Sequence, residues 1–437
     1  MKYYSTNRNT SDVSLKEAVV KGLAADNGLF MPEQIKKFEP AFFAEIQHLS
    51  FQEIAFEVAT KFFGEDIAEA KLKEIVYDTL QFDCPVVEVT ESIYSLELFH
   101  GPTLAFKDVG ARFMARLLNY FLGKQEKLVN VLVATSGDTG SAVANGFLGV
   151  DGIHVYVLYP KGKVSNIQES QFTTLGQNIT ALEVEGTFDD CQHLVKTAFL
   201  DEELNKQLVL TSANSINVAR FLPQAFYYFN AYARLKEKGK LDNKELVISV
   251  PSGNFGNLTA GLIAAEMGLP VKQFIAANNE NDVVFEYLKT GEYKPRPSVE
   301  TIANAMDVGA PSNFARILDL YKKEHSVIAG KIKGYRYSDK EIRTIISQVY
   351  SESDYLCDPH GACGYQSLTD YLTENEVGVF LETAHPAKFT ETVENVIGKG
   401  KVILPEKLAA FMKGKKKSEQ MSGNYDDFKT FLLAQSF

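Results

Sequence analysis

Beyond about residue 90, the chain alternates short apolar runs with stretches whose apolar residues recur at helical spacing. The runs are rich in β-branched residues, which predicts buried strands at 129–134, 153–159, 178–184, 208–211, 245–250, 272–277 and 378–381. Helical spacing predicts helices at 142–148, 188–204, 218–238 and 258–267. Strands that alternate with helices of this length are typical of parallel sheets with crossover helices. We therefore predict an α/β fold with two parallel-sheet α/β domains.

The first 90 residues follow a different pattern. Apolar residues recur at helical spacing over 13–25, 51–63 and 70–80, and few strand signals are present. We predict a mainly helical N-terminal region over 1–90, a first α/β domain over 91–240 and a second over 241–437. The stretch 293–334 has weak periodicity, and we expect a mobile connection there.

Composition excludes several classes of protein. The 437 residues are 45% hydrophobic, as in a globular protein, and 45 basic against 56 acidic residues leave a formal charge of −11. This acidic balance argues against a nucleic-acid partner. No apolar run is long enough to cross a bilayer, and the N-terminus lacks an apolar signal region, so we expect no membrane partner. The four cysteines are far apart or oddly spaced, which argues against a disulfide framework and for a reducing compartment, and we expect a cytoplasmic protein.

The first candidate for chemistry is Lys107. It follows the turn signal Gly101-Pro102, and Ala105 and Phe106 form an apolar wall before it. A lysine against apolar neighbours loses hydration of its ammonium, so its pKa falls, and a neutral amine can form a Schiff base with an aldehyde. On this stretch alone, an ordinary surface lysine at a helix start is favoured, because lysines are mostly exposed, and the loops further along the chain change that balance.

Unusual loops follow three of the predicted strands, where ligands bind in open parallel sheets. The loop 250–257 is rich in glycine, leads into a helix, and lacks both the Walker and the dinucleotide spacing; we favour a single-phosphate cradle over a close-packed turn. The loop 134–140 offers hydroxyls at a helix start that could bind an anion, but taken alone it is better explained as a plain βα loop with a helix N-cap. The loop 382–388 places Thr383 at a strand end; for His385 we favour a buried, hydrogen-bonded histidine.

Two further segments are polar. The segment 212–217, with Arg220 one turn into the next helix, offers donors and a cation for an anionic substrate, although Arg220 in a surface ion pair is the alternative. The segment 357–363 contains two thiols and an imidazole without a standard zinc spacing, so we assign no metal. A reactive lysine with a single-phosphate cradle suggests pyridoxal 5′-phosphate as the cofactor.

Several of these motifs occur together, in order, in one known family. The chain resembles the threonine synthase family of fold-type II pyridoxal-phosphate enzymes over most of its length, through motifs at 3–6, 28–30, 99–108, 135–140, 188–192, 212–217, 251–256, 304–308 and 383–388. The resemblance implies a fold-type II architecture. It also implies the conversion of O-phospho-L-homoserine and water to L-threonine and phosphate, a small-molecule substrate, and a monomer or homodimer.

The resemblance also implies roles for individual residues. Lys107 would bind the cofactor covalently and carry out proton transfers as the catalytic residue. Thr383 would face the pyridine nitrogen, and backbone amides would hold the cofactor phosphate at Gly253, Asn254, Phe255, Gly256 and Asn257. Substrate would be bound by Thr135, Ser136, Asp138 and Thr139 of one loop, and by Ser212, Asn214, Ser215, Asn217 and Arg220 of the other.

Other functions stay open at this point. Another fold-type II enzyme, such as a threonine dehydratase or a cysteine synthase, would use the same lysine with a different leaving group. A catalytically silent ligand-binding relative is a second alternative, which the intact Phe106-Lys107-Asp108 run and the complete 252–256 loop argue against. A non-pyridoxal α/β protein that binds another phosphate is a third.

Overall fold

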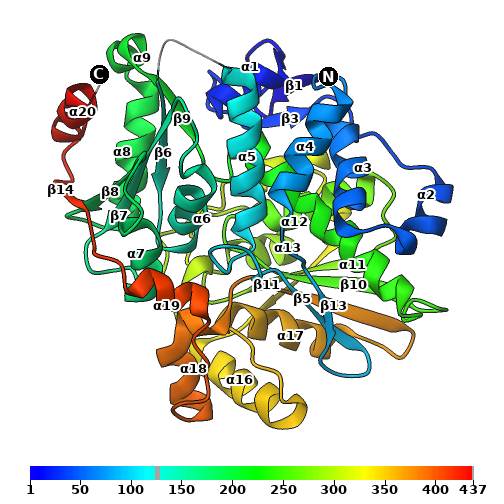
Figure 1. Cartoon of the computed structure of the whole chain (residues 1–437). Coiled ribbons are helices and arrows are strands. Elements are labelled where there is room, and N and C mark those ends of the chain that lie inside the picture. The colour runs from blue at the N-terminus through cyan, green and yellow to red at the C-terminus, as the bar shows by residue number, and fades with distance from the viewer. Residues whose placement is uncertain (124–127, 436–437) are drawn as a thin grey trace.

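The computed structural model describes residues 1–123 and 128–435 (Figure 1). Two large sheets carry the cavity described below. The first has the order β14-β8-β7-β6-β9 and is parallel throughout, with β14 (Glu419–Met421), β8 (Ile179–Val184), β7 (Ile153–Pro160), β6 (Val129–Ala134) and β9 (Val209–Ser212). These strands include four of the predicted ones, with bounds that agree within about two residues. The parallel α/β architecture predicted from the sequence is confirmed.

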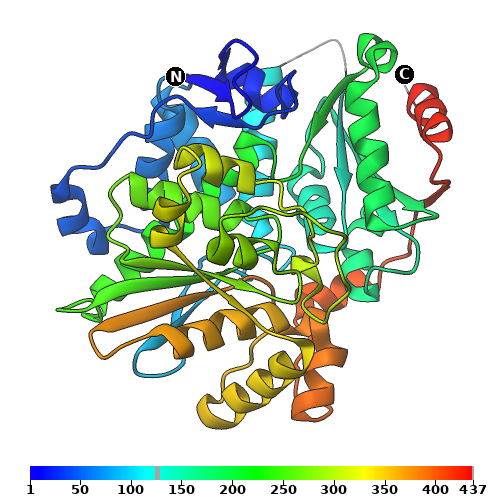
Figure 2. The same cartoon turned by 180° about the vertical axis from the view of Figure 1, so that it is seen from behind.

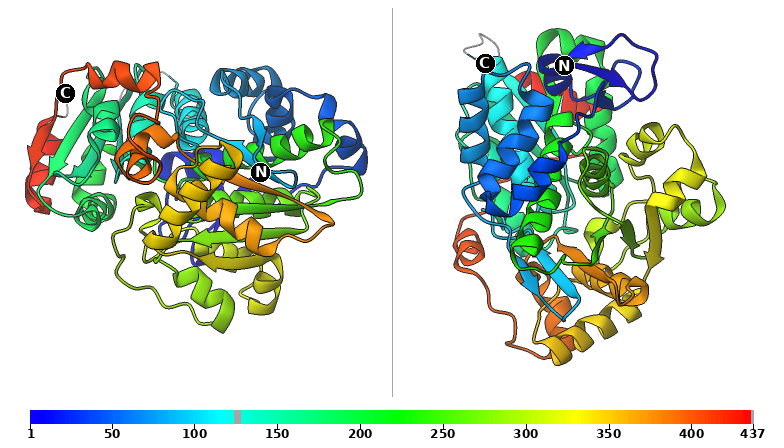
Figure 3. Two further views of the ribbon diagram at one scale, coloured as in Figure 1. Left: turned by 90° about the horizontal axis from the view of Figure 1, so that it is seen from below. Right: turned by 90° about the vertical axis from the view of Figure 1, so that its right-hand side faces the viewer.

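The second sheet has the order β12-β11-β10-β13-β5-β4. Its strands are β12 (Ile332–Arg336), β11 (Gln273–Asn278), β10 (Glu245–Pro251), β13 (Glu376–Glu382), β5 (Ile93–Glu97) and β4 (Val86–Glu88). All neighbours are parallel except β4, which pairs with β5 in the antiparallel sense. Figure 3 shows the two sheet units side by side.

Helices cover both faces of each sheet, which explains the continuous apolar runs of the strands. In β6, Val131 and Val133 pack into the core shared with α5 and α6, whereas Leu132 and Ala134 pack into the core beneath α8. The helices of this unit are α5 (Lys107–Leu122), α6 (Asp138–Phe147), α7 (Asn166–Thr173), α8 (Phe188–Leu200), α9 (Glu202–Gln207) and α20 (Tyr425–Ala434). The single helix predicted over 188–204 is two helices, because Asp201 ends α8 and caps α9.

Beyond the N-terminal region, the remaining helices and short 3₁₀ helices (η) lie between residues 218 and 412. They are α10 (Val218–Phe221), η2 (Leu222–Gln224), α11 (Ala225–Glu237), α12 (Gly256–Glu266), α13 (Val283–Thr290), η3 (Asn304–Met306), α14 (Phe314–Leu320), α15 (His325–Lys331), α16 (Asp339–Ser353), α17 (Pro359–Tyr371), η4 (Pro386–Phe389), α18 (Thr390–Ile397) and α19 (Glu406–Met412). Within the described residues, no helix has the length and apolar character needed to cross a membrane.

The N-terminal region is helical, as expected, but it also contains a small sheet that the sequence pattern did not predict. The antiparallel strands β1 (Lys2–Ser5), β2 (Val13–Ser14) and β3 (Phe30–Pro32) are short, and pairing over a long sequence separation leaves no local pattern. The helical elements are α1 (Leu15–Lys21), α2 (Pro40–Glu45), η1 (Ile46–His48), α3 (Phe51–Phe63) and α4 (Glu69–Thr79). Helix α3 packs on α11, and α4 packs on α5 (Figures 1 and 2).

The chain crosses between the two units. Strands β4 and β5 precede Lys107 but belong to the second sheet, whereas β14 and α20, at the far end of the chain, return to the first (Figure 1). The domain limits expected at 90 and 240 stay predictions, and the sheets do not follow consecutive segments of the chain.

The stretch 293–334, where weak periodicity led us to expect a mobile connection, contains regular secondary structure. It contains η3, α14, α15 and most of β12. Each helix here has seven residues or fewer, which is too short for a periodic pattern to be detected.

Candidate active site

Lys107 is the first residue of α5 and lies where the two large sheets meet. The segment before it is held against the segment after β13 by an antiparallel bridge between Ala105 and Ala384. The Phe106 amide donates to the Thr383 carbonyl at 2.8 Å. These contacts place the lysine beside the end of β13, as expected for a ligand site at the carboxyl ends of strands.

The tight turn before Lys107 is fixed by a buried carboxylate. Asp108 accepts hydrogen bonds from the Thr103 amide at 2.9 Å and from the Thr103 hydroxyl at 2.5 Å. Leu104 lies in the left-handed region with φ 57°. The carboxylate therefore sets the orientation of the lysine that precedes it.

The Lys107 amine is largely removed from water. Burial lowers its pKa to about 8, and the positive charges of Arg220 and Lys388 act in the same direction, while the charge of Asp138 acts against them. At pH 7 about a tenth of the amine is therefore neutral and nucleophilic, far more than for a lysine with an unshifted pKa. The apolar wall predicted from the sequence thus has the expected effect.

A cavity opens beside Lys107 and brings together most of the predicted site residues. They are Lys107, Thr139, Asn214, Ser215, Arg220, Gly253, Asn254, Phe255, Gly256, Asn257 and Thr383. The structure adds lining residues that were not predicted, namely Phe106, Gln224, Pro251, Ala305, Met306 and His360. The cavity thus contains side chains from both sheet units.

The glycine-rich loop after β10 has the geometry of an anion cradle. Phe255 caps α12 in the left-handed conformation, with φ 61°. Gly253 lies so close to the opposite segment that a Cβ on it would be 2.5 Å from the Ala305 carbonyl oxygen. The first amides of a helix have no partner within that helix and favour an anion. The loop therefore fits the single phosphate of pyridoxal phosphate, and Lys107 beside it fits the aldehyde.

Arg220 is a buried cation at the cavity wall. It is 3% exposed, and its guanidinium donates to the carbonyls of Ala213 at 2.8 Å and Lys107 at 3.1 Å. Within the described residues it forms no ion pair with a carboxylate, so its charge is left for an anionic ligand. Burial lowers its pKa to about 10. The surface ion pair considered from the sequence is not formed.

The segment that carries Arg220 is held by Arg316, which the sequence analysis did not identify. Arg316 is fully buried and donates to the carbonyls of Ser215 and Phe30, both at 3.0 Å. It lies on α14, inside the stretch whose weak periodicity predicted a connection. No local signal distinguishes it from a surface arginine.

Several predicted substrate residues point away from the cavity. Thr135 Oγ1 accepts from the Gly137 and Gly140 amides at 2.9 and 2.8 Å, so its hydroxyl shapes its own loop. Asn217 is fully buried, caps α10 and donates to the Val19 carbonyl at 2.9 Å. Ser136 and Ser212 are also absent from the cavity wall. Direct substrate contact by these residues stays a prediction.

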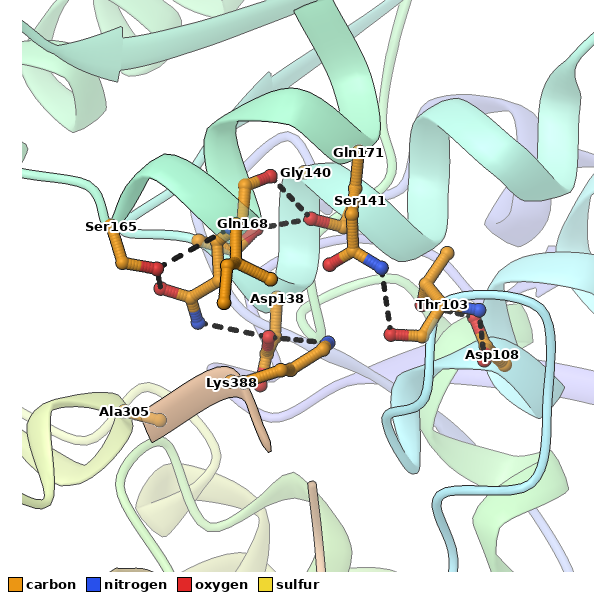
Figure 4. Close-up of polar contacts among 12 residues, drawn as sticks. Thr103, Asp108, Asp138, Gly140, Ser141, Ser165, Gln168, Gln171, Ala305 and Lys388 are labelled. Atoms are coloured by element: carbon orange, nitrogen blue, oxygen red, sulfur yellow. Dashed lines mark hydrogen bonds and ion pairs between the residues drawn. The ribbon is translucent and has the colours of Figure 1, made fainter. Parts of the chain in front are cut away.

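Asp138 also lies outside the cavity wall, where it pairs with Lys388. The sequence pattern did not single out Lys388 as a site residue. Lys388 Nζ is 2.8 Å from Asp138 Oδ1, and Gln168 Nε2 donates to the same oxygen at 2.9 Å (Figure 4). Burial raises the pKa of Asp138, but the charges of Lys388 and Lys107 outweigh this effect and lower it to about 2. Lys388 ends the 383–388 motif, and nothing in the sequence pairs it with Asp138.

His360 belongs to the segment 357–363, to which no metal was assigned, and it lines the cavity. Its Nε2 accepts from the Ala305 amide at 3.2 Å, which leaves Nδ1 to donate to Asp358 at 3.2 Å. For His385, the expected hydrogen bond is confirmed, because Nδ1 accepts from the Ala387 amide at 3.0 Å, but the residue is half-buried and not fully buried. Burial lowers its pKa to about 4.

Comparison with known proteins agrees with this geometry. A family model described as pyridoxal-phosphate dependent enzyme matches residues 85–381, and models of the threonine synthase N terminus and C-terminal part match 2–80 and 361–432. The chain is 44% identical over 436 residues to threonine synthase of Serratia marcescens, with 99% of each chain covered. It is 37% identical over 484 aligned positions to threonine synthase of Saccharomyces cerevisiae, with 95% of this chain and 94% of that one covered.

Solved structures show the same likeness. The crystal structure of threonine synthase from Escherichia coli matches with a TM-score of 0.93 and 41% identity over 100% of both chains. Threonine synthase from Brucella melitensis with bound pyridoxal phosphate matches with a TM-score of 0.92 and 34% identity, over 100% of this chain and 99% of that one. The chain therefore belongs to the threonine synthase family of fold-type II pyridoxal-phosphate enzymes.

Proposed function

We propose that the cavity around Lys107 carries out the threonine synthase reaction, in which O-phospho-L-homoserine and water give L-threonine and phosphate. The observation that carries this assignment is the combination in one cavity of the Lys107 amine, a single-phosphate loop and the buried Arg220, which forms no ion pair with a carboxylate in the part of the chain that the structure describes. The first two features fit the cofactor, and the third provides for a second phosphate, that of the substrate. A dehydratase needs no site for a substrate phosphate, so it would not need the unpaired charge of Arg220.

We assign the cofactor contacts to two segments. The amides of residues 253–257 hold the cofactor phosphate at the start of α12, and Thr383 offers a neutral hydroxyl at the end of β13 to the ring nitrogen. A hydroxyl at this place, unlike a carboxylate, would not favour a proton on that nitrogen. The bound cofactor supplies an electron sink for negative charge on the substrate carbon next to the amine.

Lys107 then moves protons. Once the substrate amine has displaced it, Nζ would accept the proton from the substrate Cα. A Cβ proton would then be removed as phosphate leaves Cγ, a proton would be added at Cγ, and Cα would be reprotonated after water has added at Cβ, with Nζ carrying most of these transfers. A pKa of about 8 suits both directions, because the amine can accept a proton and release it again near neutral pH. Arg220, with Asn214 and Thr139 in the same wall, binds the phosphate that leaves from Cγ, and water then adds at Cβ.

The test is phosphate release from O-phospho-L-homoserine by the cofactor-loaded protein, with the amino-acid product identified by mass spectrometry. Stoichiometric phosphate and threonine, both abolished in Lys107→Ala, are the expected result. A yellow protein that releases no phosphate from this substrate would refute the proposed reaction while leaving the cofactor in place.

A cytoplasmic location is part of the same proposal. It is supported by the cysteines, because Cys84, Cys191, Cys357 and Cys363 are all buried and unbridged. For the assembly we keep the expectation of a monomer or a homodimer acting on a small-molecule substrate. Light scattering coupled to size exclusion distinguishes these two states from larger ones.

A further inference from the structure

A buried ion pair joins the two sheet units beside the cavity. Asp138 begins α6 after β6, and Lys388 lies in η4 after β13, 250 positions along the chain (Figure 4). The Lys388 side chain is 0% exposed and that of Asp138 is 5% exposed. Removing two charges from water is costly, and the pair often contributes little net stability. Its presence here calls for an explanation other than stability.

The charges around the cavity suggest that explanation. Asp138 is the sole acidic residue of the loop 135–140, whose Thr139 lines the cavity. An unpaired carboxylate at this point would repel a substrate phosphate, because like charges in a site of low dielectric interact strongly. Lys388 cancels that charge, and Gln168 holds the carboxylate from the other side at 2.9 Å. The positive charge of Arg220 is then free to act on the ligand.

We propose that Lys388 is a positioning residue for the phosphate group of the substrate, acting through Asp138. It neutralises Asp138 and ties the loop 135–140 to the segment after β13, so that this loop and Arg220 together receive a phosphate. The inference rests on the proposed function and deepens it, by naming a residue that gives the site its preference for an anionic substrate.

The same pair also bears on Lys107. The charged groups that face this lysine are Asp138 on α6, Arg220 on α10 and Lys388 on η4. Asp138 raises the pKa of Lys107 and Lys388 lowers it, so the two charges oppose each other while burial dominates. Without the Lys388 charge, the pKa of Lys107 rises, and the pH at which the apoenzyme takes up cofactor moves upward.

The experiment compares Lys388→Met, Asp138→Asn and the double variant, each as holoenzyme. Three quantities are measured: the KM for O-phospho-L-homoserine, inhibition by inorganic phosphate, and L-threonine affinity from the absorbance of the bound cofactor. In Lys388→Met, the KM and the phosphate inhibition constant should rise roughly tenfold or more, whereas L-threonine, which has no phosphate, should bind within about twofold of wild type. Thermal unfolding reports whether each variant is folded.

The double variant separates indirect from direct action. If Lys388 acts through Asp138, it becomes dispensable once residue 138 is neutral, and the double variant should bind phosphate as Asp138→Asn does. This comparison uses only Asp138→Asn and the double variant, so it can still be made if the unpaired carboxylate prevents Lys388→Met from folding. A double variant that binds phosphate much more weakly than Asp138→Asn would overturn the positioning role.

Lys416→Met is the matched control. It removes a lysine that pairs with Glu183 at 2.8 Å on the first sheet, outside the cavity wall, and should leave phosphate affinity unchanged. Equal losses of phosphate and threonine affinity in Lys388→Met would reduce the pair to a structural role and overturn the inference. Failure of the wild type to release phosphate would refute the proposed function instead.

Discussion

At the scale of single residues, Lys107 combines two properties that usually exclude each other. It is charged in water, yet it lies against apolar neighbours, and burial lowers its pKa to about 8. An unfolded chain would hold the proton up to pH values above 10. The folded protein therefore destabilises the protonated amine, which favours its nucleophilic form.

This shift predicts how cofactor loading depends on pH. Only the neutral amine attacks the aldehyde, so the rate at which the apoenzyme binds pyridoxal phosphate should rise by about tenfold between pH 7 and pH 9 and level off above pH 8–9. Stopped-flow absorbance of the cofactor measures this rate. A rate that keeps rising tenfold per pH unit up to pH 10 would indicate an unshifted lysine.

A second prediction at this scale concerns Gly253. A Cβ there would lie 2.5 Å from the Ala305 carbonyl oxygen, so Gly253→Ala must displace either the phosphate loop or the 303–306 segment. Overpacking of this kind costs about 1–3 kcal/mol, and we expect the cofactor to dissociate roughly tenfold or more faster. Dialysis followed by absorbance measures retention. Gly330→Ala is the control, because nothing lies within 4 Å of that Cβ and cofactor retention should not change.

At the scale of elements, the loop between β9 and α10 shows how a polar segment can serve structure and chemistry together. Arg220 and Asn214 reach the cavity, whereas Asn217 caps α10 and donates to the carbonyls of Val19 and Ser212. The cap fixes the helix that presents Arg220. Its amide thus affects the site without being part of the cavity wall.

Replacement of this cap should change both stability and substrate affinity. Asn217→Ala removes the acceptor for the Ala219 amide and two donors, so we expect a loss of about 1–2 kcal/mol in unfolding free energy and a KM raised several-fold. Denaturant unfolding and steady-state kinetics measure the two effects. Asn424→Ala is the matched control, because it removes the cap of α20 and should lower stability with an unchanged KM.

At the scale of the whole molecule, the C-terminal end of the chain returns to the first sheet and completes it. Strand β14 extends that sheet beside β8, and α20 covers α8 with Phe428, which is fully buried (Figure 1). Between these two elements and β9, the chain builds the whole second sheet except β4 and β5. The C-terminal segment is therefore tied to residues more than 200 positions earlier.

The packing of α20 on the first unit predicts how a substitution of Phe428 affects stability. Phe428→Ala leaves a cavity under α20 and should lower the free energy of unfolding by about 3–5 kcal/mol. Denaturant unfolding followed by circular dichroism measures the loss. Ile403→Ala, at a side chain that is 83% exposed, should change it by less than about 0.5 kcal/mol. Equal effects of the two substitutions would contradict this packing.

The sequence by itself determined the features that depend on local order. The apolar run 129–134 is strand β6, because a strand covered on both faces is apolar throughout. The 51–63 pattern is helix α3, where the Ser50–Glu53 capping box and a buried face agree. Lys107 and the 253–257 loop were also identified as candidates from the sequence, because the residues next to them in the chain indicate their chemistry.

Only the tertiary structure decided which distant residues meet. Asp138 and Lys388 are 250 positions apart, and their pairing has no local signal. The clamp formed by Arg316 and the place of β5 beside β13 also depend on long-range packing. Local sequence sets which conformations and reactive groups are available. Packing sets which of those groups face the cavity, because burial and charge compensation act between segments that come together only in the folded chain.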